Sequence, residues 1–225
     1  MRTKTSPNTK TSPAKTSRNT KTSRNTKTSP DTAPARFNAR YYSKWYGDTD
    51  DRADIAARAL RFVLSYIDYM DADVDSMLDL GCGLGLWKQA LKKQAKGIRY
   101  TGVEYSPYLC EKYGWEQGDA ATYSPRKTFD LVVCQGVLQY LPDAACEQAI
   151  ANLAKLSRRF LYLEVLTKAD AREVCCPEGT DFDVHLRDAA WYAVRLKDHF
   201  VNLGGGVYAK PRMRDHYFEL WCTSL

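Results

Sequence analysis

The chain has 225 residues, a length that suits one domain with a substantial hydrophobic core and is short for two. Its net charge of +6 is concentrated in residues 1–35, which carry +7, so that residues 36–225 carry −1. A globular part this close to neutral lacks the broad basic surface that binds phosphate backbones, and we expect no nucleic-acid binding by the folded domain. The sequence predicts neither a membrane-spanning segment nor a secretory signal, because long apolar runs are missing.

The seven cysteines are scattered and show no spacing typical of a zinc site, so we predict no bound metal. Cys134 and Cys222 lie in apolar runs that predict buried strands. The adjacent Cys175 and Cys176 belong to an ordinary loop or form a redox or soft-metal pair. This cysteine usage is typical of a reducing compartment and indicates a cytoplasmic protein.

Residues 1–35 form a degenerate repeat rich in Lys, Thr and Ser. Such a composition buries too little apolar area to offset the cost of ordering the backbone, so we expect a disordered basic tail. It is a tether, a phosphorylation target or a solubilising leader. The folded domain is expected to span residues 36–225.

A helical cap is predicted over residues 36–75. It begins with the aromatic stretch Phe37–Gly47 and continues as an amphipathic helix over Asp50–Met70. The apolar stripe of that helix is expected to comprise Ile55, Ala59, Phe62, Val63, Tyr66 and Met70.

From Ser76 onward, short apolar runs alternate with helical patterns, which predicts a parallel sheet covered by helices on both faces. The expected strands are Met77–Leu80, Ile98–Val103, Trp115–Gln117, Phe129–Gln135, Phe160–Val165, Val207–Lys210 and His216–Thr223. The expected helices after the cap are Leu86–Ala95, Pro107–Tyr113, Asp143–Ser157 and Leu186–Leu203. The last two strands are joined by a short turn and predict an antiparallel C-terminal β-hairpin. The fold class is therefore α/β: a doubly wound, mostly parallel seven-stranded sheet in three layers, α/β/α.

A glycine-rich turn follows the first of these strands, in the segment Asp79-Leu-Gly81-Cys82-Gly83-Leu-Gly85. Glycines let a ligand lie against bare backbone, and the helix that follows adds free N–H groups and a positive dipole. The dinucleotide-binding fingerprint is not met, because it requires glycine at position 86, where this chain has Leu86. The segment resembles the first motif of the class I S-adenosylmethionine (SAM)-dependent methyltransferases, acidic-x-Gly-x-Gly-x-Gly.

Three further segments match this family in order, each at the carboxyl end of a predicted strand, where ligands of open α/β sheets bind. The resemblance implies that Glu104, followed by Tyr105, binds the ribose of SAM. It implies that Asp119 and Ala120, in Gly-Asp-Ala, meet the adenine. It also implies that Gln135 faces the methionine part and the acceptor.

Two regions are expected to close the site. Tyr42, within the aromatic cap, either contacts SAM by a cation–π interaction or packs as ordinary core. Residues 166–185 form a long polar connection and a substrate lid. A hydroxyl or ammonium acceptor needs a base, for which His185 is the first candidate and Glu164 the second, followed by Asp183 and His199.

The resemblance implies methyl transfer from SAM. Motifs typical of enzymes that methylate adenine, glutamine or cytosine C5 are missing, so we expect an oxygen or nitrogen atom of a small molecule as acceptor. Two alternatives stay open: a methyltransferase that acts on RNA or protein and docks through the basic tail, and a SAM-binding protein without turnover. The oligomeric state is not predicted.

Overall fold

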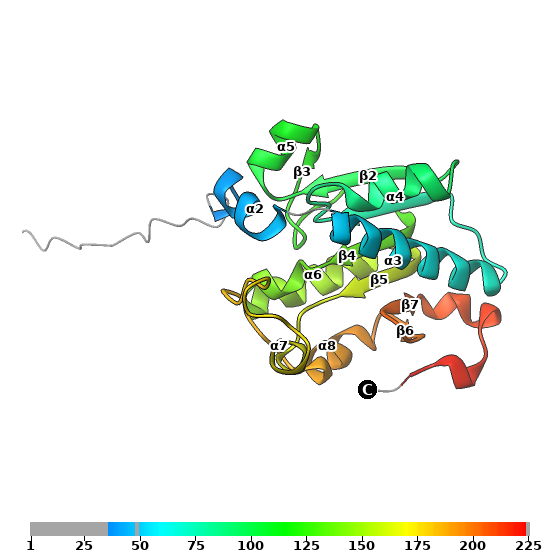
Figure 1. Ribbon diagram of the computed structural model, residues 1–225. Coiled ribbons are helices and arrows are strands. Elements are labelled where there is room, and N and C mark those ends of the chain that lie inside the picture. The colour runs from blue at the N-terminus through cyan, green and yellow to red at the C-terminus, as the bar shows by residue number, and fades with distance from the viewer. Residues whose placement is uncertain (1–35, 48–49, 224–225) are drawn as a thin grey trace, which may run out of the picture. The chain divides into compact units, whose positions relative to one another are not determined.

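The computed structural model describes residues 36–47 and 50–223, and Figure 1 shows how their helices and strands are arranged. The tail predicted over residues 1–35 lies outside the described residues. None of the helices in the described part combines the length and apolar character that crossing a bilayer requires.

One seven-stranded sheet organises the fold. Its strands are β1 (Ser76–Leu80), β2 (Arg99–Glu104), β3 (Glu116–Gln117), β4 (Phe129–Gln135), β5 (Ser157–Glu164), β6 (Val201–Asn202) and β7 (Val207–Ala209). Their spatial order is β3-β2-β1-β4-β5-β7-β6. The first five strands are parallel, whereas β7 is antiparallel to both β5 and β6. The predicted doubly wound, mostly parallel sheet with an antiparallel hairpin is confirmed.

Helices surround this sheet and connect its strands. They are α2 (Ala39–Tyr46), α3 (Asp50–Tyr69), α4 (Leu86–Gln94), α5 (Pro107–Tyr113), α6 (Asp143–Leu156), α7 (Lys168–Glu173) and α8 (Ala189–Leu196), with the 3-10 helices η1 (Leu138–Tyr140), η2 (Pro211–His216) and η3 (Glu219–Trp221).

The core lies on both faces of the sheet, because successive strand residues point to opposite sides. Phe160 packs in one cluster with Leu60 of α3 and residues of α4. Leu161, its neighbour on β5, packs in the other cluster with Ile150 of α6 and residues of α8. The three-layer prediction is thus confirmed, and Figure 1 shows α3 and α4 next to each other on one side.

The chain reverses its direction of travel across the sheet between β1 and β4. It runs outward from β1 to β2 and β3, then returns so that β4 pairs with β1. Connections at the carboxyl ends of these two strands therefore diverge and leave room between them, which is where open α/β sheets bind ligands. This edge of the sheet is the first place to look for a functional site.

The composition of the C-terminal hairpin differs from the prediction. Helix α8 ends at Leu196, well before the expected Leu203, and Val201–Asn202 forms β6 instead. Gly204, Gly205 and Gly206 all have positive φ, at 86°, 59° and 79°. Because these glycines turn the chain back at once, β7 pairs with the segment that precedes them rather than with the one that follows.

The predicted strand His216–Thr223 is wrong. Pro211, which has no N–H to give to a strand ladder, starts η2, and the remaining segment holds η3. Buried Met213 anchors η2 to the core. Cys222 is therefore partly exposed outside any strand, whereas Cys134 is fully buried in β4 as expected.

The buried stripe of α3 is also shifted from the prediction. Ile55 and Phe62 are 49% and 46% exposed, although both were expected in the stripe. The residues that pack against the sheet and α4 are Ala56, Leu60, Val63, Ile67 and Met70. Several apolar side chains surround this helix, and the contact with its neighbours decides which of them are covered.

Candidate functional site

The glycine loop follows β1, at the place where the chain reverses its direction across the sheet between β1 and β4, which we call the switch. Gly81, Gly83 and Gly85 have φ of 86°, 50° and 74°. A Cβ atom on Gly81 would come within 2.3 Å of Val137, and one on Gly85 within 2.6 Å of Trp115. A Cβ on Gly83 would meet nothing within 4 Å. Protein packing thus requires the first and third glycines, whereas the second presents bare backbone to open space.

Glu104 binds this loop from the end of β2. The residue is only 6% exposed. Oε2 accepts a hydrogen bond from the backbone N–H of Gly83 at 2.8 Å, and Oε1 accepts one from the N–H of Ser106 at 2.9 Å. Each carboxylate oxygen keeps a further lone pair. The tertiary structure therefore joins two motifs that the sequence identified separately.

Asp79 is buried beneath the loop, with 2% exposure. The phenol of Tyr100 donates to its Oδ2 at 2.7 Å. Burial first, and the charge of Glu104 in addition, raise the pKa of Asp79 to about 7, against the opposing effect of the Tyr100 hydrogen bond. The Cys82 thiol is also buried, and burial raises its pKa, so it is an unreactive packed side chain. Only the backbone of Cys82 is suited to ligand contact.

The segment after β3 lies beside Glu104. The N–H of Gly118 donates to the backbone oxygen of Glu104 at 3.0 Å. The side chain of Asp119 accepts a hydrogen bond from the backbone N–H of Ala121 at 2.7 Å, which stabilises a turn. The carbonyl of buried Ala120 accepts a hydrogen bond from the side-chain amide of Asn152. Burial and the charge of Asp119 raise the pKa of Tyr105. Tyr105 and Asp119 are therefore near each other, and the Gly118 hydrogen bond keeps their two segments together at the end of β2.

A hydrogen-bonded row crosses the ends of β4 and β5. The indole N–H of Trp87 donates to Gln135 Oε1 at 2.7 Å, which leaves the amide Nε2 of Gln135 to donate to Glu164 Oε2 at 3.1 Å. The phenol of Tyr162 donates to the same carboxylate oxygen at 2.9 Å. Gln135 and Glu164 were predicted separately. Trp87 and Tyr162 were missed, because helix and strand periodicity mark them only as core residues.

A cleft of about 320 Å³ adjoins Glu164. It lies between the end of β5, the start of α8 and the glycine turn before β7. Its lining residues are Tyr162, Leu163, Glu164, Val165, Thr167, Ala189, Tyr192, Gly205, Gly206 and Tyr208. A carboxylate among aromatic rings suits a small ligand that carries a polar hydrogen on an apolar body.

His185 lies beside η1. Its backbone N–H donates to the carbonyl of Gln139 at 2.7 Å, and its side chain is exposed. Within the described residues, the imidazole has no hydrogen-bond partner and does not join the row that contains Glu164. The side-chain oxygen of Gln139 is buried and accepts no hydrogen bond from any described residue. His199 follows α8, outside this group.

The aromatic cap covers Glu104. The ring of Phe37 meets that of Tyr105 edge-on at 6.3 Å, and its carbonyl accepts the hydroxyl of Ser106. Burial, together with the charge of Glu104, raises the pKa of Tyr42. The predicted Tyr42 is therefore a near neighbour of the buried carboxylate, and the expected helix over the site is α2.

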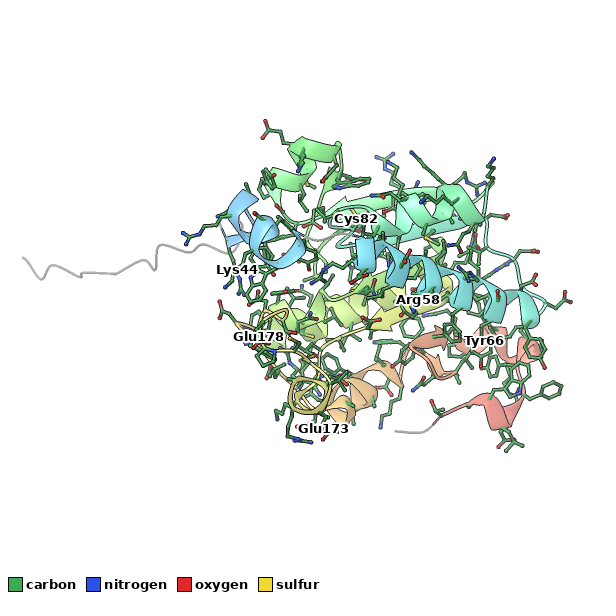
Figure 2. The ribbon with its side chains drawn as sticks, in the orientation of Figure 1. Lys44, Arg58, Tyr66, Cys82, Glu173 and Glu178 are labelled. Atoms are coloured by element: carbon green, nitrogen blue, oxygen red, sulfur yellow. The ribbon has the colours of Figure 1, made fainter. Side chains whose placement is uncertain are left out.

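A polar contact joins this cap to the segment after α7; we call Arg36, Tyr41, Tyr140 and Asp181 the clasp. Arg36 Nη2 lies 2.8 Å from Asp181 Oδ2, which also accepts the Tyr41 hydroxyl at 2.9 Å. The hydroxyls of Tyr41 and Tyr140 are 2.8 Å apart. Arg36 also pairs with Asp183 at 3.1 Å, so this candidate base is engaged elsewhere. In Figure 2, Lys44 of α2 and Glu178 of the segment after α7 lie at the same end of the molecule.

The segment predicted as a lid, residues 166–185, contains a helix that the sequence did not predict. Thr167 and Asp170 form a capping box at the start of α7, with each side chain bonding the other's backbone N–H. Cys176, the exposed member of the cysteine pair, donates to Glu178. Within the described residues, no group of three or more His, Cys, Asp or Glu side chains gathers as metal ligands do.

Comparison with known proteins identifies the family. A family model described as "Methyltransferase domain" matches residues 50–203, which is more than half of the chain. The match includes the glycine loop, Glu104, Asp119 and the row at the ends of β4 and β5.

Curated relatives match the chain in part. The ubiquinone biosynthesis O-methyltransferase of Xylella fastidiosa (strain 9a5c) is 29% identical over 124 residues, which are 49% of this chain and 49% of that protein. The trans-aconitate 2-methyltransferase of Azoarcus sp. (strain BH72) is 31% identical over 100 residues, 41% of this chain and 39% of that protein. The chain thus spans about half or less of the length of these relatives.

Solved structures share the fold. The magnesium protoporphyrin IX methyltransferase of Synechocystis PCC 6803 with bound S-adenosyl-L-homocysteine (SAH) superposes with a TM-score of 0.55 and 16% identity, covering 79% of this chain and 94% of that one. An N-methyltransferase of Bradyrhizobium japonicum WM9 in complex with SAH gives 0.51 and 19%, covering 72% and 90%. The resemblance to class I methyltransferases is confirmed. The chain belongs to the methyltransferase-domain family.

Proposed function

We propose that this protein transfers a methyl group from SAM to an oxygen or nitrogen atom of a small-molecule acceptor. The observation that carries the proposal is the buried carboxylate of Glu104, which holds the N–H of Gly83 beside open space at the switch between β1 and β4. A nucleoside that lies against the Gly83 backbone would bring its ribose hydroxyls to the free lone pairs of this carboxylate.

The other residues at this edge suit the remaining parts of SAM. Asp119 and the N–H of Ala120 would receive the adenine, next to Tyr105. Asp79, beneath the glycine loop, would favour the cationic end of the ligand once it is ionised. Gln135, which the Trp87 indole orients, would face the methionine part. The backbone of the loop from Gly81 to Gly85 would line the ligand.

We further propose that the cap and the lid close over the cofactor. Glu104 is 6% exposed and lies near Tyr42 of α2, so α2 would have to move away for SAM to enter. The clasp would hold the closed state through the pair between Arg36 and Asp181. Closure excludes water, which strengthens the electrostatic interactions within the site. Residues 36–75 are then the cap, residues 166–185 the lid, and residues 36–225 the catalytic domain.

The acceptor would lie in the cleft beside Glu164. SAM, when bound, supplies a methyl group on a cationic sulfur, and an in-line displacement needs orientation more than covalent help. Gln135 joins the two sites because its amide bonds Glu164. Glu164 would take up the proton that the acceptor's hydroxyl or ammonium group releases. His185 is the alternative base. Its exposed ring would have to move with the lid toward the acceptor.

The small-molecule acceptor is supported by the size of the cleft and by the relatives. Two relatives carry names that describe methylation in ubiquinone biosynthesis and of trans-aconitate. All seven cysteines lie in the described residues as free thiols, which supports a cytoplasmic location. The tail over residues 1–35 would be dispensable for catalysis. We expect no nucleic-acid or membrane partner of the folded domain.

The test is methyl transfer by the purified full chain. Binding of SAM and SAH is measured by calorimetry, and transfer of labelled methyl is measured with phenols, carboxylic acids and amines as acceptors. Binding and transfer to a small molecule, unchanged when residues 1–35 are removed, are expected. Label found only on RNA or protein, and lost without the tail, would favour the macromolecular alternative. SAM binding without transfer to any acceptor would favour a non-catalytic protein, and failure to bind SAM would refute the proposal.

A further inference from the structure

A second cavity lies at the amino ends of the strands, whereas the glycine loop lies at their carboxyl ends. Its volume is about 410 Å³. The residues that line it are Thr128, Ala154, Lys155, Ser157, Arg158, Lys210, Pro211 and Arg212. They come from the start of β4 and β5, the end of α6 and the segment after β7, so the cavity is at the amino edge of the sheet and separate from the proposed methyl-transfer site.

Four cationic side chains line this cavity, and no carboxylate does. The charge of Arg158 is compensated by Asp130, whose Oδ1 is 2.6 Å from Arg158 Nη2. Asp130 is buried, and its other oxygen accepts the Ser76 hydroxyl at 2.8 Å. Within the described residues, Lys155, Lys210 and Arg212 have no carboxylate at ion-pair distance. Three of the four lining cations therefore lack a carboxylate partner within the described residues.

The fold holds two of these cations in place. The ammonium of Lys210 donates to the carbonyl of Ala154 at 3.1 Å and lies 4.9 Å from the ring of Phe200. Arg212 donates to the carbonyl of Arg158. Buried Met213 fixes the backbone between them, since its N–H donates to the carbonyl of Lys210 at 2.8 Å.

The charges at this place are unfavourable for the protein alone. Burial lowers the pKa of Lys210, and the nearby charge of Arg212 lowers it further. Lys210 and Arg212 each use one donor on a backbone carbonyl and retain others, and Thr128 adds a hydroxyl. A ligand with two negative charges and several acceptor oxygens would satisfy these donors and relieve the repulsion between the cations.

We infer that this cavity binds the phosphate group of a small phosphorylated molecule. Phosphate offers the oxygens that guanidinium and ammonium groups bind, and 410 Å³ leaves room for an organic part beside it. The inference does not depend on the proposed methyl transfer, because the two sites lie at opposite edges of the sheet.

The test is binding of inorganic phosphate and pyrophosphate to the full chain, measured by calorimetry at constant ionic strength with acetate as the reference anion. We expect pyrophosphate to bind more tightly than acetate, and Arg212→Gln to weaken it about tenfold, which corresponds to about 1.4 kcal/mol. Lys210→Met should have a similar effect. The matched control is the double variant Lys92→Gln, Lys93→Gln, which removes two exposed charges from α4 and should leave the affinity unchanged.

Two results would overturn the inference. Equal loss of phosphate binding in the control and in Arg212→Gln would mean that the anion responds only to the overall charge of the chain. Binding of a single-stranded RNA oligonucleotide that requires Lys210 and Arg212, without binding of pyrophosphate, would assign the surface to nucleic acid. Urea denaturation, measured in parallel, reports whether each variant is folded and should show the same free energy of unfolding as the parent.

Discussion

Replacing Glu104 by Gln tests the link between the glycine loop and the cofactor most directly. The carboxylate accepts two backbone N–H groups, from Gly83 at 2.8 Å and from Ser106 at 2.9 Å, and is almost fully buried. Glutamine keeps the shape but offers one carbonyl oxygen and one NH₂ group. One of the two N–H groups then faces a donor instead of an acceptor.

The magnitude follows from these contacts. A hydrogen bond to a charged group is worth about 1.5–3 kcal/mol, so the free energy of unfolding should fall by about that amount. If the remaining lone pairs accept the ribose hydroxyls, the binding of SAM should weaken by a further ~1.5–3 kcal/mol, which is roughly 10- to 150-fold in Kd. The two losses are separable because one is measured without ligand.

Urea denaturation of the free protein and calorimetric titration with SAM and SAH provide the two measurements. Glu111→Gln, an exposed carboxylate on α5, is the matched control and should change neither. A stability loss with SAM affinity within twofold of the parent would restrict Glu104 to holding the loop and remove it from the ribose. No change in either measurement would refute the hydrogen-bond reasoning itself.

Three further substitutions test other parts of the site. Gly83→Ala places a methyl group in the open space at a φ of 50°. The backbone strain should lower the free energy of unfolding by about 1 kcal/mol, and the methyl group should weaken SAM binding by more than about tenfold. Unchanged calorimetric affinity for SAM would contradict the assigned position. Folding raises the pKa of Asp79 to about 7 from an ordinary 3.8, so between these values the folded state keeps a proton that the unfolded chain has released. The free energy of unfolding should therefore fall as pH rises from about 4 to 7, by up to about 4 kcal/mol. Asp79→Asn should remove that slope in urea denaturation series, and parallel slopes for parent and variant would refute it. Arg36→Ala breaks the pair with Asp181 and should speed SAM dissociation about fivefold in stopped-flow experiments, and an unchanged rate would exclude the clasp from closure.

Much of the fold and of the proposed cofactor site could be predicted because their signals are local. The turn from Asp79 to Gly85 combines a strand, glycines and a helix start within a few residues. The acids Glu104 and Asp119 follow directly on the ends of strands. Parallel strands align these ends at one edge, so the strand pattern alone predicted that the motifs would meet.

The prediction failed where local patterns allow two outcomes. An amphipathic helix with apolar residues on several sides does not specify which stripe is covered, and contact with the sheet buried Ala56 instead of Ile55. A glycine turn can pair the following strand with either neighbour. The positive φ angles at Gly204–Gly206 selected the preceding residues, and the predicted final strand was lost.

The sequence by itself determined the order of strands and helices, the glycine loop and the acids at the strand ends, since these depend on residues close together in the chain. Only the tertiary structure decided which distant side chains complete the site. Trp87 orients Gln135, Tyr162 and Gln135 share Glu164, and Arg36 reaches Asp181 across 145 positions of the chain. Such contacts depend on how the helices and strands pack and on which face of each one points toward the site. Neither can be predicted from a short segment of sequence.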